Sequence, residues 1–521
     1  MHVLPSKEIG ACVTRASVGR DREIGVELVE RDVDHAKKLQ GPHAAKGTRS
    51  LRHPDSGGAI LMGVTEPSPT RNPMFQYDET LANLVFDYCR RRLSLEPVPL
   101  DLGGQAPWLS KDLVAGLIGP RPTDPEKILS VFSEHLAPAI VSADSPRFLS
   151  FIPAVPTKAS LLFDMIVSCS CLQGTSWLEA AGAVLAENQA LRVLADLAGL
   201  PASAGGCFVS GGSMGNLSAL VVARDTAPSR LGGVKPSRPR VVVSDETHSS
   251  VAKALNIIGV EPLIVPHRDH RLTGDAIDHA LAESGAAESV VAVVATAGTT
   301  NAGLVDDLAG ISQVTRRRDI WLHVDGAYGG AALFAPSVRD RFAGIEEADS
   351  LVIDPHKWLY APFDCAALLY RDPALARPVH SQQAEYLDVF HDTEEFNPSD
   401  YAYHLTRRAR GLPLWFSLAV YGTDAYRDAV EQVLTTARLS AALIEETEHV
   451  ELVRQPELSV VLFSRPGWER ADYDKWSVQL LDDQIGFVTP TSWEGRPVGR
   501  FAFLHPDTSL EMVAEILATL A

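Results

Sequence analysis

The segment Ser289-Val-Val-Ala-Val-Val-Ala-Thr296 decides the fold class, because it has no charged residue and most of its side chains are β-branched. Continuous apolarity of this kind predicts a strand that is buried on both faces. Similar runs recur along the chain, namely CFVS (207–210), VVVS (241–244), PLIVP (262–266), IWLHVD (320–325), SLVID (350–354) and CAALLY (365–370). Amphipathic stretches separate these runs, so the sequence predicts an α/β fold with a mostly parallel central sheet between layers of helices.

The chain on either side of this core has a different composition. Its first part mixes both charge signs with Gly, Pro and Ser, although Ile24–Leu28 alternates like a short strand. Apolar residues then recur at helical spacing in Asp78–Leu95, Pro125–Leu136 and Leu178–Ala198. We therefore expect a disordered extension at 1–73, an N-terminal helical segment at 74–157, a large α/β domain at 158–412 and a small α+β domain at 413–521.

The small C-terminal domain is expected to contain both helices and strands. Helical periodicity covers Leu412–Tyr426 and a further stretch that ends at Thr447. The runs LSVVLFS (458–464) and GRFAFL (499–504) then predict strands, and Ser509 is positioned to cap a last helix.

The overall composition excludes several classes of function. The 521 residues are 45% hydrophobic and 22% charged, which is typical of soluble globular proteins. A formal net charge of −19 has the wrong sign for nucleic-acid or anionic-lipid partners. Six dispersed cysteines suggest neither a disulfide scaffold nor a zinc knuckle, and no apolar run has the length of a membrane span. We expect a cytoplasmic protein without a metal site.

Chemically useful side chains follow four of the predicted strands. In a parallel sheet these carboxyl ends form the ligand-binding edge. Ser210-Gly-Gly-Ser-Met-Gly-Asn216 follows the first strand and opens a helix, so its backbone N–H groups can hold a phosphate. His248, Asp325 and Lys357 follow three other strands. A phosphate site, a flat ring, a carboxylate and an amine together match pyridoxal 5'-phosphate (PLP), which has a phosphate, an aromatic ring, a basic nitrogen and an aldehyde.

Two functions outside PLP catalysis compete for the same residues. Gly211-Gly-Ser213-Met-Gly215 matches the GxSxG pattern of a serine hydrolase, with Ser213 as the nucleophile. The chain has no HGGG-type segment for an oxyanion hole, however, and a hydrolase gives no role to Lys357. The other competitor is a PLP-binding or scaffold protein without activity. We favour the PLP enzyme over both.

Five ordered blocks of the sequence, spread over about residues 78–521, resemble the group II PLP-dependent amino-acid decarboxylases. These blocks are DETHSSVAKA (245–254), ATAGTTNAGLVDDL (295–308), WLHVDGAYGG (321–330), DPHKWLYAPFDC (354–365) and RRARGLPLWFSLAVYG (407–422). The resemblance implies the PLP-dependent transferase fold of the aspartate aminotransferase class (fold type I) and a homodimer. It also implies an α-decarboxylase that converts an L-amino acid to its amine and CO2.

The family's motifs imply roles for individual residues of this chain. Lys357 is implied as the lysine that holds PLP as a Schiff base, and Asp325 as the partner of the pyridinium nitrogen. His248 is implied to stack on the ring and to lie near the substrate carboxylate. The phosphate-binding positions are Gly212 and Ser213.

Further residues are placed less directly by the resemblance. Thr300 and His356 are implied as additional neighbours of the cofactor, and Tyr386 as a loop tyrosine that protonates the substrate carbon after CO2 has left. Asp354 departs from the family, because many relatives have an asparagine there that donates to the phosphate. Ala154 stands where aromatic decarboxylases have a threonine.

The substrate class stays open at the level of the sequence. Overall likeness to the aromatic branch favours an aromatic amino acid, with Phe148, Phe151 and Trp177 as candidates for its pocket. Glutamate, aspartate and 2,4-diaminobutyrate decarboxylases are alternatives, as is an aldehyde-forming synthase of the same fold.

Overall fold

The computed structural model describes residues 72–152, 155–230, 232–233, 235–285, 287–385 and 395–521. Contacts within the chain set residues 77–521 apart as the larger of two units. None of the helices in the described ranges is long and apolar enough to cross a membrane.

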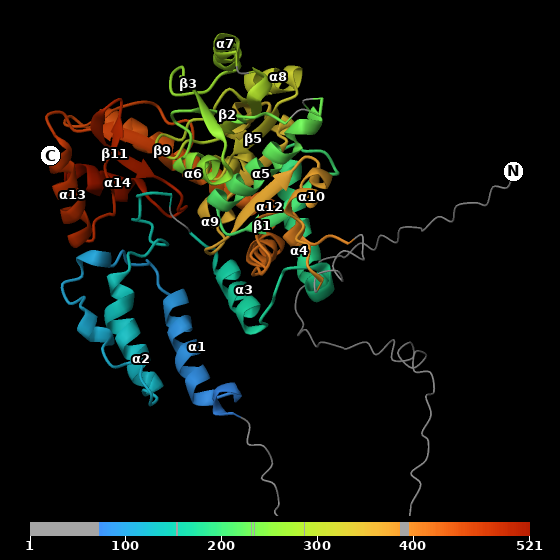
Figure 1. Cartoon of the computed structure of the whole chain (residues 1–521). Coiled ribbons are helices and arrows are strands. Elements are labelled where there is room, and N and C mark those ends of the chain that lie inside the picture. The colour runs from blue at the N-terminus through green and yellow to red at the C-terminus, as the bar shows by residue number, and fades with distance from the viewer. Residues whose placement is uncertain (1–71, 153–154, 231, 234, 286, 386–394) are drawn as a thin grey trace, which may run out of the picture. The chain divides into compact units, whose positions relative to one another are not determined.

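A seven-stranded sheet forms the centre of the larger unit (Figure 1). Its order is β1-β7-β6-β5-β4-β2-β3. Neighbouring strands from β6 to β3 run parallel, whereas β7 is antiparallel to both β6 and β1. The mostly parallel sheet predicted from the apolar runs is thereby confirmed. Its strands are β1 (Gly205–Val209), β2 (Arg240–Ser244), β3 (Glu261–Val265), β4 (Val290–Thr296), β5 (Trp321–Asp325), β6 (Ser350–Ile353) and β7 (Ala366–Tyr370).

Helices cover both faces of this sheet, which explains why its central strands read as continuous apolar runs. All seven residues of β4 are buried, and so are all five of β5. One face packs on α5 (Gly212–Arg230) and α6 (Ser249–Ile258). The opposite face packs on α4 (Trp177–Leu197), α7 (Gly274–Ser284), α8 (Leu308–Arg318) and α12 (Leu412–Glu445).

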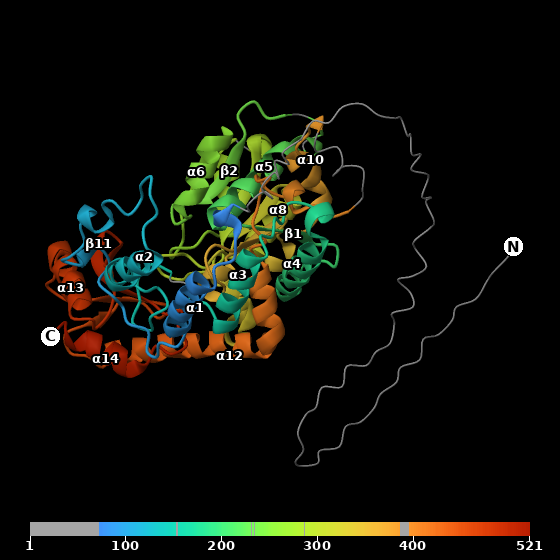
Figure 2. The ribbon, with the colours of Figure 1, turned by 90° about the horizontal axis from the view of Figure 1, so that it is seen from below.

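The C-terminal part adds a second, smaller sheet, as the sequence predicts. Its four strands are antiparallel in the order β10-β11-β9-β8, and α12 runs from the region of α3 and α4 to α14 (Figure 2). Gly422 interrupts α12 with a φ of 77°, four residues before the end expected for the first helical stretch, Leu412–Tyr426. The elements are β8 (Glu451–Leu452), β9 (Val460–Ser464), β10 (Thr491–Trp493), β11 (Arg496–Ala502), α13 (Arg470–Asp482) and α14 (Leu510–Ala518).

The N-terminal part of the larger unit is helical. It contains α1 (Glu79–Leu93), α2 (Pro125–Val131) and α3 (Lys158–Cys169), and a π-turn continues α2 to Leu136. Asp78 caps α1 by accepting from the backbone N–H of Thr80. The short helices α9 (Pro355–Trp358) and α10 (Arg377–His380) flank β7. The possible strand at Ile24–Leu28 lies outside the described residues.

A buried ion pair joins α4 to the segment that precedes α12. Arg407 and Glu187 are both almost fully buried and meet in a two-pronged contact, with N–O distances of 2.8 Å on each side. Glu187 also accepts from the backbone N–H of Gly411 at 2.8 Å, and Arg407 donates to the carbonyl of Gly174 at 2.5 Å. These added hydrogen bonds leave Nε of Arg407 as the one side-chain nitrogen or oxygen of the pair without a partner among the described residues. Removing one residue would leave the charge of the other buried and unpaired.

Replacement of the arginine should therefore be costly. We expect Arg407→Met to lower the free energy of unfolding by about 3–5 kcal/mol, because the Glu187 carboxylate loses its countercharge. Urea denaturation followed by circular dichroism measures this change. Arg470→Ala, which breaks an exposed pair with Asp474, is the control and should barely shift the midpoint. Equal midpoints for the two variants would contradict the structural role assigned to the buried pair.

Candidate active site

A cavity of about 370 Å³ lies at the carboxyl ends of the parallel strands. Its walls are formed by residues that directly follow β1, β2, β4, β5 and β6. The described site residues predicted from the sequence all line it, namely Gly212, Ser213, His248, Thr300, Asp325, His356 and Lys357. Tyr386 lies outside the described residues. The topology of the sheet thus brings together side chains that are far apart in the sequence.

The turn between β1 and α5 is built for close approach. A Cβ atom on Gly212 would lie 2.9 Å from the Cβ of Ala327 and 3.1 Å from Oδ2 of Asp354, so only glycine fits there without displacement. The N–H of Gly212 donates to the same Oδ2 at 3.2 Å. The positive end of α5 consequently faces the cavity, as an anion site requires.

Lys357 lies on the short helix α9, beside a buried carboxylate. Its Nζ is 3.0 Å from Oδ2 of Asp354, which is only 2% exposed. The other oxygen of Asp354, Oδ1, has no hydrogen-bond partner among the described residues. Asp354 therefore acts as an acceptor and as the countercharge of Lys357, unlike the asparagine that donates to a phosphate in many similar enzymes.

Asp325 ends β5 and is held by two donors. Its Oδ2 accepts from Nδ2 of Asn216 at 2.8 Å, and its Oδ1 accepts from the backbone N–H of Ala327 at 3.1 Å. Asn216 lies one turn into α5, is 1% exposed and also lines the cavity. It stands at the end of the glycine-rich turn, yet sequence reasoning assigned it no role.

The two histidines of the site have different surroundings. His248 caps α6, and its Nδ1 accepts from the backbone N–H of Ser250 at 3.2 Å, which fixes the ring at the cavity wall. His356 is buried, with Nδ1 2.6 Å from the carbonyl oxygen of Cys365. Burial lowers the pKa of His356, so its ring is neutral at neutral pH.

A buried arginine from the small sheet supports the part of the cavity wall that Thr300 and Asn301 form. Arg500 on β11 donates to the carbonyl oxygens of Thr300 at 2.5 Å, Asn301 at 3.2 Å and Phe151 at 2.9 Å. Burial lowers its pKa to about 10. Sequence reasoning missed this residue because no local pattern links β11 to a loop about 200 positions earlier.

The aromatic residues predicted for the substrate pocket, Phe148, Phe151 and Trp177, are not part of the cavity lining. The rings of Phe148 and Phe487 are 4.9 Å apart, and those of Phe151 and Phe487 are 6.1 Å apart. Trp177 begins α4 and donates its backbone N–H to Asn397. Of the described residues, none of these aromatic side chains lines the cavity. Ala154 falls outside the described ranges.

The cavity has the polar groups that PLP requires. It combines helix N–H groups for a phosphate, an acceptor for a ring nitrogen in Asp325, and an amine in Lys357. Two buried oxygens at its wall, Oδ1 of Asp354 and Oγ1 of Thr296, have no hydrogen-bond partner among the described residues. Unpaired buried oxygens are rare in proteins and are typical of a site that a polar ligand completes.

The competing hydrolase lacks its required geometry. Ser213 lies in the first turn of α5, but no histidine in the described part of the chain forms a hydrogen bond with it. Of the two histidines that line the cavity, His248 is hydrogen-bonded to Ser250, and Nδ1 of His356 lies at the carbonyl oxygen of Cys365. A serine nucleophile needs a base within hydrogen-bond reach, so the GxSxG match is a coincidence of the phosphate-type turn.

Comparisons with known proteins agree with this site. Residues 114–465 match the model of the pyridoxal-dependent decarboxylase conserved domain. The chain is 30% identical over 409 residues to aromatic-L-amino-acid decarboxylase of Bacillus atrophaeus, covering 76% of this chain and 84% of that protein. It is 34% identical over 380 residues to L-2,4-diaminobutyrate decarboxylase of Rhizobium meliloti, covering 70% and 74%.

A solved structure gives the same result for the fold. The crystal structure of Oryza sativa TDC with PLP and tryptamine superimposes with a TM-score of 0.79 at 25% identity, covering 87% of this chain and 99% of that one. The transferase fold expected from the sequence is thus confirmed, with PLP as the cofactor. The chain belongs to the pyridoxal-dependent decarboxylase family and is a PLP-dependent amino-acid decarboxylase.

Proposed function

We propose that this enzyme decarboxylates an aromatic L-amino acid to its amine, with Lys357 as the residue that binds PLP covalently. The observation that carries the proposal is the convergence of Lys357, Asp325 and the start of α5 on one cavity. Gly212 and Ser213 would hold the phosphate, and Asp325 would accept from the protonated ring nitrogen. His248 would cover one face of the ring, with Thr300 and His356 as neighbours.

The chain's own residues control the protons of the reaction. The Lys357 amine must lose a proton before its nitrogen can attack a carbonyl, and the nearest carboxylate is Asp354, 3.0 Å away. When bound, PLP supplies an electron sink for the electron pair that CO2 leaves behind on the substrate. Asp325 would keep the ring nitrogen protonated, which that sink requires.

The aromatic preference is supported by the position of Phe148, Phe151 and Phe487. Through Arg500, the backbone of Phe151 is tied to Thr300, which lines the cavity. An aromatic side chain that extends from the cavity toward Phe151 would meet a residue that is 61% exposed.

A second substrate class is favoured by one other residue. Glu246 lines the cavity, and a carboxylate there could pair with the side-chain ammonium of 2,4-diaminobutyrate. This alternative agrees with the 34% identity to the Rhizobium meliloti enzyme.

A substrate panel distinguishes these alternatives. PLP-loaded protein is incubated with aromatic, acidic and diamino L-amino acids, and the amines are identified by mass spectrometry. We expect aromatic monoamines, and 1,3-diaminopropane as the main product would favour the second class. Lys357→Ala is the control, which should form no amine and retain no PLP on the protein after borohydride reduction. Amine formation by Lys357→Ala at the wild-type rate would contradict the assignment.

Tyr386 is proposed to deliver the proton to Cα once CO2 has left. A phenol with a pKa near 10 is protonated at neutral pH and can serve as a general acid. Without it, the same carbon is exposed to O2, and amino acid, O2 and water then give aldehyde, CO2, ammonia and H2O2 in equal amounts.

The balance of products tests this role. We expect Tyr386→Phe to keep releasing CO2 while amine yield falls several-fold and aldehyde, ammonia and peroxide rise, because general acids contribute about 100-fold or more to such steps. Chromatography of the products and a peroxide assay measure the ratio. Tyr403→Phe, at another tyrosine with a 70% exposed side chain, is the control. An unchanged amine yield in Tyr386→Phe would show that another group donates the proton.

We further propose that the enzyme is a cytoplasmic homodimer. None of the residues of α1 is buried, and its Leu81, Val85 and Phe86 are each more than 40% exposed. On α3, Leu162 and Ile166 lie one turn apart and are about half exposed. Such apolar helix faces are typical of a subunit interface. The described cysteines are all free thiols, which suits a reducing compartment.

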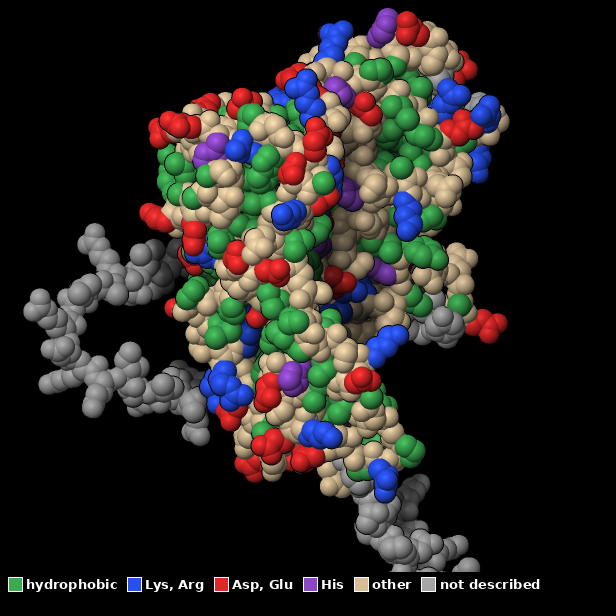
Figure 3. Space-filling model, turned by 90° about the vertical axis from the view of Figure 1, so that its left-hand side faces the viewer, with side chains coloured by type: hydrophobic (Ala, Val, Ile, Leu, Met, Phe, Trp, Pro, Cys, Tyr) green, Lys and Arg blue, Asp and Glu red, His purple; other side chains and the backbone are tan. Residues whose placement is uncertain are grey.

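Charged side chains of both signs lie on the described surface of the enzyme (Figure 3). On the face drawn in Figure 3, basic side chains (blue) are intermixed with acidic ones (red). This mixture agrees with the net charge of −19 and with an amino-acid substrate rather than nucleic acid or a lipid surface.

The dimer can be tested by a charge placed on α3. We expect wild-type protein to sediment at twice the chain mass of 56.2 kDa and Leu162→Glu to shift toward the monomer, because a charge in an apolar interface is poorly solvated. Analytical ultracentrifugation measures the mass. Val478→Glu alters an equally exposed residue on α13 and should leave the mass unchanged. A monomeric wild type, or a dimer unaffected by Leu162→Glu, would overturn this interface.

A further inference from the structure

Alternate residues of β5 form a polar line behind the cavity. Trp321, His323 and Asp325 are at positions i, i+2 and i+4 of one strand, so their side chains share a face. All three are at most 6% exposed. Leu322 and Val324 point to the opposite face and belong to the apolar core there. A buried histidine and a buried carboxylate on one strand face require hydrogen-bond partners.

At the cavity end, the acceptor character of Asp325 fixes the orientation of Asn216. A carboxylate can only accept, so the Asn216 atom 2.8 Å from Oδ2 of Asp325 is the Nδ2 donor. The same NH2 group donates to Oγ of Ser250 at 3.1 Å. The Asn216 carbonyl oxygen therefore points away, and it lies 2.9 Å from Nε2 of His323. His323 must donate from Nε2.

At the far end, the series of hydrogen bonds begins with the indole of Trp321. Its indole N–H can only donate, and it donates to Oγ of Ser350 at 2.8 Å. Ser350 is the strand neighbour of His323 on β6, and its Oγ lies 2.8 Å from Nδ1 of that ring. Because Nε2 carries the hydrogen of a neutral imidazole, Nδ1 accepts from the Ser350 hydroxyl.

The two ends thus agree on a single direction of donation. It runs from the Trp321 indole to the Ser350 hydroxyl, then to His323, then to the Asn216 amide, and ends on the Asp325 carboxylate. Burial lowers the pKa of His323 to about 4, so the ring stays neutral and has only one N–H to give. Successive hydrogen bonds that point the same way strengthen one another.

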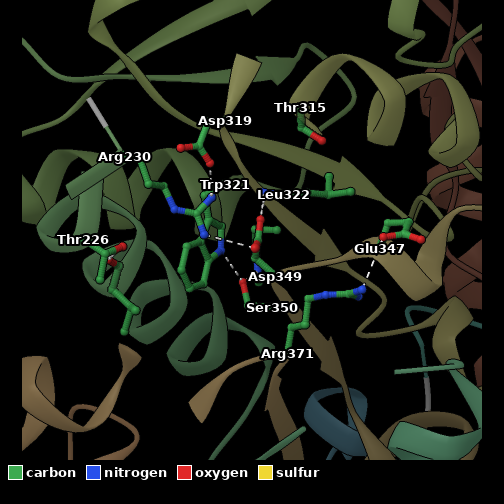
Figure 4. Close-up of polar contacts among 12 residues, drawn as sticks. Thr226, Arg230, Thr315, Asp319, Trp321, Leu322, Glu347, Asp349, Ser350 and Arg371 are labelled. Carbon is green, nitrogen blue, oxygen red and sulfur yellow. Dashed lines mark hydrogen bonds and ion pairs between the residues drawn. The ribbon is translucent and has the colours of Figure 1, made fainter. Parts of the chain in front are cut away.

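Trp321, the first donor in this series of hydrogen bonds, is anchored at the amino end of the sheet (Figure 4). The Arg230 guanidinium lies over the Trp321 ring, 5.0 Å from its centroid, and donates to Oδ1 of Asp349 at 3.1 Å. Asp349 also accepts from the backbone N–H of Leu322 at 2.7 Å, and Arg230 lies 3.7 Å from Asp319. These contacts fix the indole, so the first donor of the chain has little freedom to turn.

We propose that His323, Ser350 and Asn216 are positioning residues that aim the Asp325 carboxylate at the ring nitrogen of PLP. This inference rests on the proposed role of Asp325. Asn216 holds one carboxylate oxygen, and His323 keeps the Asn216 amide from turning its carbonyl toward Asp325. Ser350 in turn keeps His323 in the tautomer that donates to Asn216. None of the three positioning residues needs to touch the reacting atoms of the substrate.

Cofactor binding without turnover tests this proposal. The full-length apoenzyme is titrated calorimetrically with PLP and with its 1-deaza analogue, in which C–H replaces the ring nitrogen. We expect wild type to bind PLP far more tightly than the analogue. Ser350→Ala should raise the Kd of PLP about tenfold and leave that of the analogue nearly unchanged, because only PLP contacts Asp325 through nitrogen. His323→Phe should act in the same direction and more strongly.

The controls separate positioning from general damage. Ser218→Ala removes a different buried serine, which lies on α5 two residues after Asn216 and accepts from the backbone N–H of Tyr403. It should change neither Kd. If circular dichroism shows that His323→Phe does not fold, the two Kd values of Ser350→Ala decide whether the proposal holds. That variant removes only one oxygen atom. Equal weakening of both ligands, or an unchanged Kd of PLP, in Ser350→Ala would overturn the positioning role. Equal binding of PLP and the analogue by wild type would instead reject the assignment of Asp325 itself.

Discussion

The burial of one carboxylate, that of Asp325, is the constraint around which this site is organised. A carboxylate at the end of a buried strand is tolerated only when donors satisfy it. Here the donors are the amide of Asn216 and the backbone N–H of Ala327. The contact with Asn216 brings the first turns of α5 against the end of β5. The same placement aims the positive end of α5 at the cavity, where a phosphate would bind.

The second carboxylate of the site, that of Asp354, pairs with an amine of the protein rather than with the expected ring nitrogen of the cofactor. It lies between the N–H of Gly212 and the amine of Lys357, and it leaves one oxygen unpaired among the described residues. The site therefore places an anionic side chain close to its expected phosphate end, where many similar enzymes have a neutral asparagine. Lys357 is the countercharge that makes this arrangement acceptable in a buried setting.

The sequence predicts the sheet and the strand-end residues well, because both depend on local patterns. Continuous apolar runs identify buried strands, and residues that follow such runs must gather at one edge. Asn216, His323 and Arg500 escaped this reasoning because their importance depends on pairings between distant segments. His323 nevertheless left a signal, since a polar residue two positions before Asp325 on a buried strand shares its face. Arg500 left none, because its partners Thr300 and Phe151 lie in unrelated loops.

The protonation of the cofactor's ring nitrogen tests the central role of Asp325 most directly. The measurement is the nitrogen-15 NMR shift of enzyme loaded with ring-labelled PLP, compared between wild type and Asp325→Asn. We predict a protonated nitrogen in wild type at neutral pH and an unprotonated one in Asp325→Asn, because an amide carries no charge to stabilise the pyridinium. An unprotonated nitrogen in wild type, or the same shift in both proteins, would contradict the account.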